Sequence, residues 1–198
     1  MSIPPIDQSL AAIEASLRRL GRTQLLDALA PGIPARVVSE RLAQFALTST
    51  PDLDALYEWH NGCDPDACST LGQLWMFPIY YLLSLDESAA TYSALCESGR
   101  WQSNWWPVFA DGGGDFYVAN LNDCSNSQVY HFHNEYMECP IEFDSLSAMM
   151  ATIAAAFKQG IYYATSQTEP IIEIAGEFDR LAAEMNPTVA WWNDPELA

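Results

Sequence analysis

The sequence predicts an α+β domain in which helices pack against a central antiparallel or mixed β-sheet. Segments with helical periodicity come first along the chain, segments typical of strands gather between residues 74 and 133, and helical periodicity returns after residue 145. The regular alternation of strand and helix that builds a doubly wound parallel sheet is missing from this order. With 198 residues, of which 49% are apolar and 12% aromatic, the chain can bury a sizeable core.

Helices are predicted at the start of the chain. The first covers residues 10–20, with Asp7 as its N-cap, and the second covers residues 37–45, after the proline-rich break at 31–34. A third begins at Thr50, with Pro51 in its first turn, and places Leu53, Leu56 and Tyr57 on one face. We expect Asn61-Gly62 to end this helix as a left-handed C-cap.

The middle of the chain is typical of strands. The apolar run 74–83 predicts a strand with an edge or a bend at Pro78, and Ser84 with Glu87 forms a capping box that opens a helix ending near Gly99. Strands follow at 105–109, 115–121 and 128–133, the last two joined by a turn-rich spacer at 122–127. The glycines at 112–114 predict a turn with positive φ.

Two helices and a tail complete the prediction. Ser145 is expected to cap a helix that runs from Leu146 to Gly160, and an amphipathic helix follows over residues 171–185. Trp191-Trp192 lies in a short polar tail and docks either on its own domain or on a partner.

Charge is the extreme property of this sequence. It has 8 Lys and Arg against 26 Asp and Glu, for a net charge of −18. The first 41 residues carry a net charge of +1, so the acidic character belongs to the rest of the chain. Such a chain repels phosphate backbones and anionic lipids, which makes nucleic acids and membrane surfaces poor partners and a basic protein a good one.

The sequence also indicates a cellular compartment. Its start has neither a basic segment nor an apolar run typical of a signal peptide, and no stretch approaches the length needed to span a bilayer. We therefore expect a cytoplasmic protein with reduced thiols at its five cysteines, Cys63, Cys68, Cys96, Cys124 and Cys139.

Three motifs in the sequence contain residue types that can carry chemistry. His131 and His133 share one face of a predicted strand and, with a nearby carboxylate, could ligate zinc or iron; the simpler interpretation is a solvent-facing polar side of that strand. The loop from Cys63 to Cys68 lacks the spacing of a zinc knuckle, and the Gly112–Gly114 run lacks the Lys of a phosphate loop. We therefore expect no catalytic residues, no metal and no cofactor.

Four segments, read in order, resemble the SMI1/KNR4 family of the SUKH superfamily. They are the helix 53–62 ending in Asn-Gly, the strand and helix start at 77–95, the central region 105–118, and the strand 129–133 followed by Ser145-Leu146. The resemblance covers roughly residues 37–158. It assigns structural roles to Tyr57, Gly62, Trp106, Pro107, Asp115, Ser145 and Leu146.

The resemblance implies a non-catalytic α+β domain, and its bacterial members are immunity proteins that neutralise a secreted nuclease or deaminase toxin. We expect an N-terminal helical extension at 1–36, the family domain at 37–160, and a C-terminal helix and Trp-containing tail at 161–198 packing on it. The chain would be a monomer or a weak dimer. The predicted partner surface consists of Glu58, Trp59, Asp64, Asp66, Asp111, Asp115 and Tyr136.

Two alternatives stay open. One is a regulatory or scaffold protein of the same fold with no toxin partner. The other is a metal-dependent enzyme that uses His131 and His133.

Overall fold

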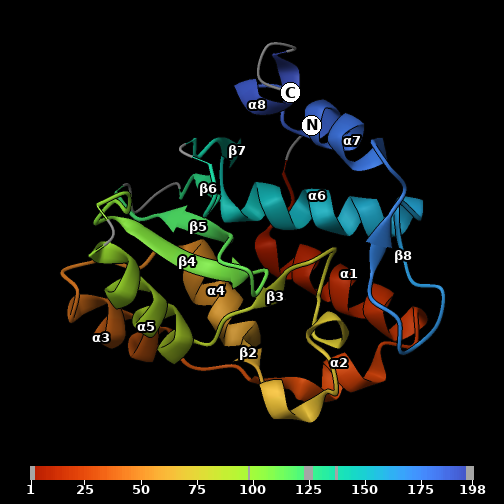
Figure 1. The fold of residues 1–198 in the computed structure, drawn as a ribbon, viewed down its shortest axis with the longest axis horizontal. Helices are drawn as coiled ribbons and strands as arrows, with labels where there is room; N and C mark the ends of the chain where they lie inside the picture. Colours follow the sequence, from red (N-terminus) through yellow and green to blue (C-terminus); the bar gives the residue numbers. More distant parts are fainter. Residues whose placement is uncertain (1–2, 98, 123–126, 137, 195–198) are drawn as a thin grey trace.

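The computed structural model describes residues 3–97, 99–122, 127–136 and 138–194 (Figure 1). Its α-helices are α1 (Ile6–Arg19), α2 (Thr23–Ala28), α3 (Ala35–Ala43), α4 (Pro51–Trp59), α5 (Leu85–Cys96), α6 (Leu146–Gln159), α7 (Glu177–Met185) and α8 (Ala190–Asn193). Two short 3-10 helices, η1 (Pro65–Ala67) and η2 (Leu71–Gln73), lie between residues 63 and 81.

The central sheet is antiparallel, with strand order β3-β4-β5-β6-β7. Its strands are β3 (Tyr81–Leu82), β4 (Trp105–Ala110), β5 (Phe116–Asn120), β6 (Val129–Phe132) and β7 (Ile141–Phe143). Two small antiparallel pairs flank it: β1 (Leu29–Pro31) with β2 (His60–Cys63), and β8 (Tyr162–Tyr163) with β9 (Ile172–Glu173). The predicted α+β class with an antiparallel sheet is confirmed.

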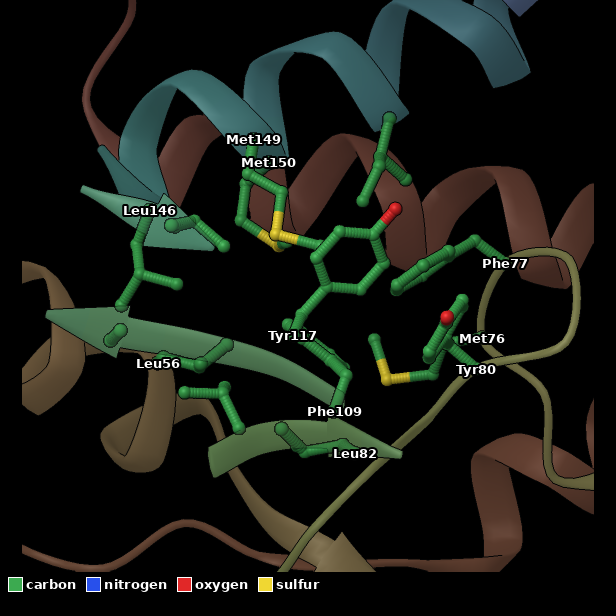
Figure 2. Packing of buried hydrophobic residues seen from close by; sticks show 14 of the residues in the cluster. Leu56, Met76, Phe77, Tyr80, Leu82, Phe109, Tyr117, Leu146, Met149 and Met150 are labelled. Carbon is green, nitrogen blue, oxygen red and sulfur yellow. The ribbon is translucent and has the colours of Figure 1, made fainter. Parts of the chain in front are cut away.

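Helices pack on the face of the sheet from which Tyr117 projects. On this face α6 crosses the strands and packs against α1 (Figure 1). Figure 2 shows Tyr117 projecting from β5 toward α6, close to Met150 and Phe77. Trp106 lies on this same face, because it pairs with Ala119, two residues from Tyr117, and its fully buried ring lies against Phe45, just after α3, and Tyr92 of α5.

The predicted helix caps are confirmed where the signal is local. The Thr50 hydroxyl accepts a hydrogen bond from the Leu53 N–H at 3.3 Å, and Pro51 occupies the first turn of α4. The capping box at Ser84 opens α5, and Ser145 caps α6. Gly160 ends α6 with φ +74°, as predicted.

The predicted role of Gly62 as a helix C-cap is wrong. Helix α4 ends at Trp59, His60 is extended, and Gly62 lies inside β2. Its φ is +81°, and a Cβ there would stand 2.4 Å from the Ser84 backbone nitrogen. The glycine is therefore required because the chain passes close to the start of α5, not because a helix stops.

Pro107 lies in a central strand, where a proline is unusual. The pairing of β4 with β5 shifts register between Pro107 and Phe109. Because a bulge interrupts the regular hydrogen-bond ladder, it accommodates a residue without an N–H.

Three other predicted elements differ from the structure. Asp7 is not an N-cap, because α1 begins one residue earlier, after Pro5. The apolar run 74–83 forms only β3 and a tight hairpin, with a bridge between Phe77 and Tyr80. The predicted helix over 171–185 begins only at Glu177, because Ile172 and Glu173 pair with β8. The turn 122–127 lies mostly outside the described residues.

The segments at both ends pack against the family-like centre. One cluster of buried side chains contains residues of α1, of the sheet and of α7, and Trp192 of α8 packs against it. The Trp192 ring lies against Phe143 and Phe178, and its Nε1–H donates to the Glu142 carbonyl at 2.5 Å, so this side chain docks on its own chain. The boundaries predicted at residues 36 and 160 stay a prediction.

Within the described residues, no helix combines the length and the apolar character needed to cross a membrane. The cysteines described, Cys63, Cys68, Cys96 and Cys139, are free thiols. Cys124 lies outside the described residues.

Candidate functional site

A pocket of about 460 Å³ lies where the α6-facing side of the sheet meets β8, β9, α7 and α8. We call it the His131 pocket. Its aromatic walls come from Phe77, Tyr80, Tyr117, Tyr162, Phe178, Trp191 and Trp192. Its polar side chains are His131, His133, Glu142, Glu173 and Asp179, and none of the described residues that line it is Lys or Arg.

A chain of hydrogen bonds forms the floor of this pocket. Tyr117 donates its hydroxyl to Glu142 Oε2 at 2.8 Å, and Glu142 Oε1 lies 2.7 Å from His131 Nδ1. His131 Nε2 lies 2.5 Å from the Tyr80 hydroxyl. Glu142 is only 3% exposed, so these partners replace the water that its carboxylate would otherwise bind.

The chemistry of these partners assigns the protons. A carboxylate only accepts, so His131 donates from Nδ1–H to Glu142 and accepts from the Tyr80 hydroxyl at Nε2. Burial raises the pKa of Tyr80, and the nearby charges of Asp115, Asp111 and Glu142 raise it further. Burial and the Glu142 charge likewise place the pKa of Tyr117 well above its ordinary value. Both phenols are therefore neutral donors at physiological pH.

A second pair lies at the mouth of the pocket. Asp115 Oδ2 is 3.1 Å from His133 Nδ1, and Asp115 Oδ1 accepts from the Asn134 N–H at 2.8 Å. Burial opposes ionisation, but the Asn134 hydrogen bond and the His133 ring outweigh it and lower the pKa of Asp115. The His131 and His133 rings have centroids 3.8 Å apart, which joins the two pairs.

Arg100 holds the segment that follows β6. Its guanidinium donates to the carbonyls of His133 and Asn134 at 2.9 and 2.8 Å, and it lies 5.1 Å above the centre of the Phe132 ring. This clamp positions His133, and with it Tyr136, whose exposed ring meets the His133 ring edge-on.

The prediction that His131 lies on a solvent-facing side of its strand is wrong. Its side chain is 12% exposed, because the hairpin at Tyr80 and the C-terminal segment cover this side of the sheet. The opposite side is covered as well, with Tyr130 against Trp105 and Phe132 against Trp101.

The predicted partner residues lie on several elements. Asp111 and Asp115 belong to the turn between β4 and β5, where Asp111 Oδ1 accepts hydrogen bonds from the N–H groups of residues 113–115. The predicted positive φ in this turn is confirmed at Gly112 and Gly114. Asp115 and Tyr136 both contact His133, so the structure brings these two predicted residues together.

The other predicted residues lie around the end of α4. Glu58 is exposed on its last turn, and Asp64 and Asp66 are exposed in the loop after β2. Trp59 is half-buried, since its Nε1–H donates to Glu14 Oε2 at 3.1 Å. It is therefore less available to a partner than Tyr136, which is 65% exposed.

Several residues of the His131 pocket were not predicted from the sequence. Tyr117 pairs directly with His131 across β5 and β6, so strand alternation would have placed both on one face. Glu142 lies in β7, a strand that was not predicted, and Glu173 and Asp179 come from the C-terminal segment. No local signal marks those three as neighbours of His131.

Comparison with known proteins places these residues in a family. The model of the SMI1 / KNR4 family (SUKH-1) matches residues 50–152, from the start of α4 into α6. A search of curated proteins gave no match. Tyr80, Asp115, His131 and Glu142 lie inside the matched range, whereas Glu173, Asp179 and Trp192 lie outside it. The match spans more than half of the chain, which therefore belongs to the SMI1/KNR4 family (SUKH-1).

Proposed function

We propose that this protein is a non-catalytic immunity protein that neutralises a bacterial toxin of nuclease or deaminase type by binding to it. The observation that carries the proposal is a net charge of −18 in a member of a family that includes immunity proteins. Toxins that act on nucleic acids need basic surfaces to bind phosphate. An acidic protein attracts such a surface over a distance and covers it.

The proposed mechanism is stoichiometric occlusion in the cytoplasm. The immunity protein binds the toxin where the toxin would otherwise bind its substrate, so no chemical step is required. Long-range attraction raises the rate of encounter, and a few buried side chains at the centre of the interface then set the lifetime of the complex.

The mouth of the His131 pocket is the best-supported part of the binding surface. Asp115 and Asp111 lie in one turn beside it, and Glu173 and Asp179 line its other side. The pocket walls are mainly aromatic, so an Arg or Lys side chain of the toxin would meet both carboxylates and ring faces.

Two exposed apolar side chains near this mouth are suited to anchor a partner. Ile79 is 47% exposed at the tip of the hairpin and has φ +63°, a conformation that a β-branched residue rarely adopts. Tyr136 is 65% exposed. An exposed, strained Ile contributes nothing to the core, so contact with a partner accounts for it better than folding does.

The predicted residues Glu58, Asp64 and Asp66 form a second candidate patch. They are exposed, and Asp64 Oδ1 accepts a hydrogen bond from the Asp66 N–H at 2.9 Å. We propose that this patch contributes to steering rather than to the buried centre, because it offers charge without an exposed aromatic side chain.

The experiment compares charge reversals at the two patches. The wild type and the variants Asp179→Lys and Asp64→Lys are immobilised, exposed to lysate of the producing cells and washed at low and high salt. Bound proteins are identified by mass spectrometry. We expect one stoichiometric basic partner with a nuclease-like or deaminase-like domain, reduced by Asp179→Lys more than by Asp64→Lys, and retained less at high salt.

Glu184→Lys is the matched control, because Glu184 lies on the same helix as Asp179 and is exposed but does not line the His131 pocket. If Asp179→Lys and Glu184→Lys reduced the amount of captured partner equally, the pocket mouth would be refuted as the binding surface. Several ordinary cellular proteins, or none, would contradict the immunity function and favour a regulatory or scaffold protein.

A further inference from the structure

We propose that Asp115, His131 and His133 bind one divalent transition-metal ion of the zinc class at the mouth of the His131 pocket. One potential ligand atom from each of these residues lies within 4.8 Å of the other two, and all three side chains are partly buried. This site goes beyond the toxin-binding function and does not depend on it.

The register of the sheet brings the three residues together. Phe116 pairs with Phe132, so the next positions outward, Asp115 and His133, lie opposite each other where β5 begins and β6 ends. His131 precedes His133 by two residues and therefore lies on the same side of β6. The sequence did not identify which carboxylate could join the two histidines, and this pairing supplies Asp115.

The distances suit a tetrahedral ion. Asp115 Oδ2 and His133 Nδ1 are 3.1 Å apart. Zinc bonds of 2.0–2.1 Å to nitrogen and oxygen give an edge of about 3.4 Å between neighbouring ligands in a tetrahedron. These two atoms are thus already placed at nearly the separation that a shared ion requires.

His131 is oriented by a buried carboxylate, as metal-binding histidines usually are. Its Nδ1–H donates to Glu142, which is itself held by the Tyr117 hydroxyl, so Nε2 is the nitrogen left to face an ion. The arrangement fixes the ring and its tautomer before any ion arrives.

The Tyr80 hydroxyl is the competing partner, since it lies 2.5 Å from His131 Nε2. An ion at Nε2 displaces this hydroxyl, and that loss lowers the affinity. Removing the hydroxyl should therefore strengthen binding, whereas removing a ligand should weaken it. Opposite effects at neighbouring residues distinguish coordination from general damage to the pocket.

The donor set selects the ion. Two imidazoles and one carboxylate suit zinc and related transition metals, whereas calcium and magnesium prefer oxygen ligands alone. The charge of the surroundings also favours a cation, because Glu142, Glu173 and Asp179 line the same pocket and no Lys or Arg does among its described lining residues. Three protein ligands leave a fourth position for water.

The test uses the purified full-length protein, stripped with a chelator and titrated with zinc chloride by calorimetry. We expect about one ion per chain, an affinity reduced by about tenfold or more in His133→Ala and Asp115→Asn, and a reduction of about 10–100-fold in Glu142→Gln. Tyr80→Phe should bind at least as tightly as the wild type. His60→Ala is the control and should bind like the wild type, because His60 lies in β2, which belongs to a different sheet from β5 and β6.

Cobalt absorption identifies the ligands independently. Cobalt at the proposed site should show no thiolate charge-transfer band, because the ligands are nitrogen and oxygen, and cysteine alkylation should leave binding unchanged. Absence of stoichiometric zinc binding would overturn the proposal, as would full binding by the folded double variant His131→Ala/His133→Ala. Should that variant not fold, unchanged binding by His133→Ala and Asp115→Asn, whose side chains lie nearer the surface, would overturn it equally.

Discussion

Arg22 offers the sharpest test of how the two ends of the chain are joined to its centre. It is 1% exposed although it carries a charge, and its guanidinium donates to four backbone carbonyls. Two of these, at Gly72 and Gln73, lie in η2, at 3.3 and 2.9 Å. The others belong to Gln167 and Glu169, in the loop between β8 and β9. One side chain thus fastens the N-terminal helices to two separate loops.

The cost of removing this side chain follows from those contacts. A hydrogen bond from a charged donor stabilises a protein by about 1.5–3 kcal/mol. The contacts to Gly72 and Gln167 are long, and Gln167 and Glu169 lie in an exposed segment where water replaces the guanidinium. Burying the charge also costs free energy, and desolvation lowers the pKa of Arg22 accordingly. The two shorter hydrogen bonds, to Gln73 and Glu169, dominate the loss, and part of it is offset because the charge no longer has to be buried. We therefore expect Arg22→Met to destabilise the protein by about 2–4 kcal/mol.

Urea unfolding followed by tryptophan fluorescence measures this difference. Arg36→Met is the control, because Arg36 is exposed on α3, and its loss should change the free energy of unfolding by less than about 0.5 kcal/mol. Arg22→Lys should recover little of the stability. The single ammonium group of Lys cannot donate to η2 and to the β8–β9 loop at once, as the planar guanidinium of Arg22 does. An Arg22→Met protein as stable as the wild type would refute the argument.

Three further predictions concern stability. Gly62→Ala should lower the free energy of unfolding by about 3 kcal/mol or more, measured by urea titration, because its Cβ would meet the Ser84 backbone and its φ is positive; a change below about 1 kcal/mol would contradict this. Trp192→Ala should cost about 2–3 kcal/mol through lost packing, and a truncation at residue 189 of equal stability to the wild type would show that the tail does not dock. Hydrogen bonds from Arg18 and Trp59 lower the pKa of Glu14 below 4.5. The Glu14 carboxylate therefore stabilises the folded protein above about pH 4.5, and this stabilisation is lost as the pH falls through the lower pKa of the folded state. The difference in Tm between wild type and Glu14→Gln should close between pH 5 and pH 3, and a difference that stays constant would contradict this prediction.

Local signals predicted much of this fold. The caps at Thr50, Ser84 and Ser145 involve a side chain and a backbone group three residues away, so the sequence alone carries that information. The end of α6 at Gly160 was also predicted from a local signal, a glycine directly after a helical apolar stripe. Gly62 shows the limit: its positive φ was expected, but the cause is a close approach to Ser84, 22 positions along the chain.

The missed elements are those that depend on a distant partner. Strands β7 and β9 have three and two residues, too few for a periodic pattern, and each exists because it pairs with another strand. The candidate site likewise depends on strand pairing between distant parts of the chain. Asp115, His131 and His133 were each noted in the sequence, but only the pairing of β5 with β6 joins them, and Glu142 comes from β7.

The central claim is that this acidic protein binds one basic partner through the mouth of the His131 pocket. The most direct measurement is capture of proteins from the producing cells by the wild type and by the Asp179→Lys and Glu184→Lys variants, with washes at low and high salt. We predict that the wild type captures one stoichiometric basic protein. Capture should be reduced by Asp179→Lys and unchanged by Glu184→Lys, and less of the protein should be retained after the high-salt wash. Capture of the same proteins by all three forms, or of no basic protein at all, would contradict the claim.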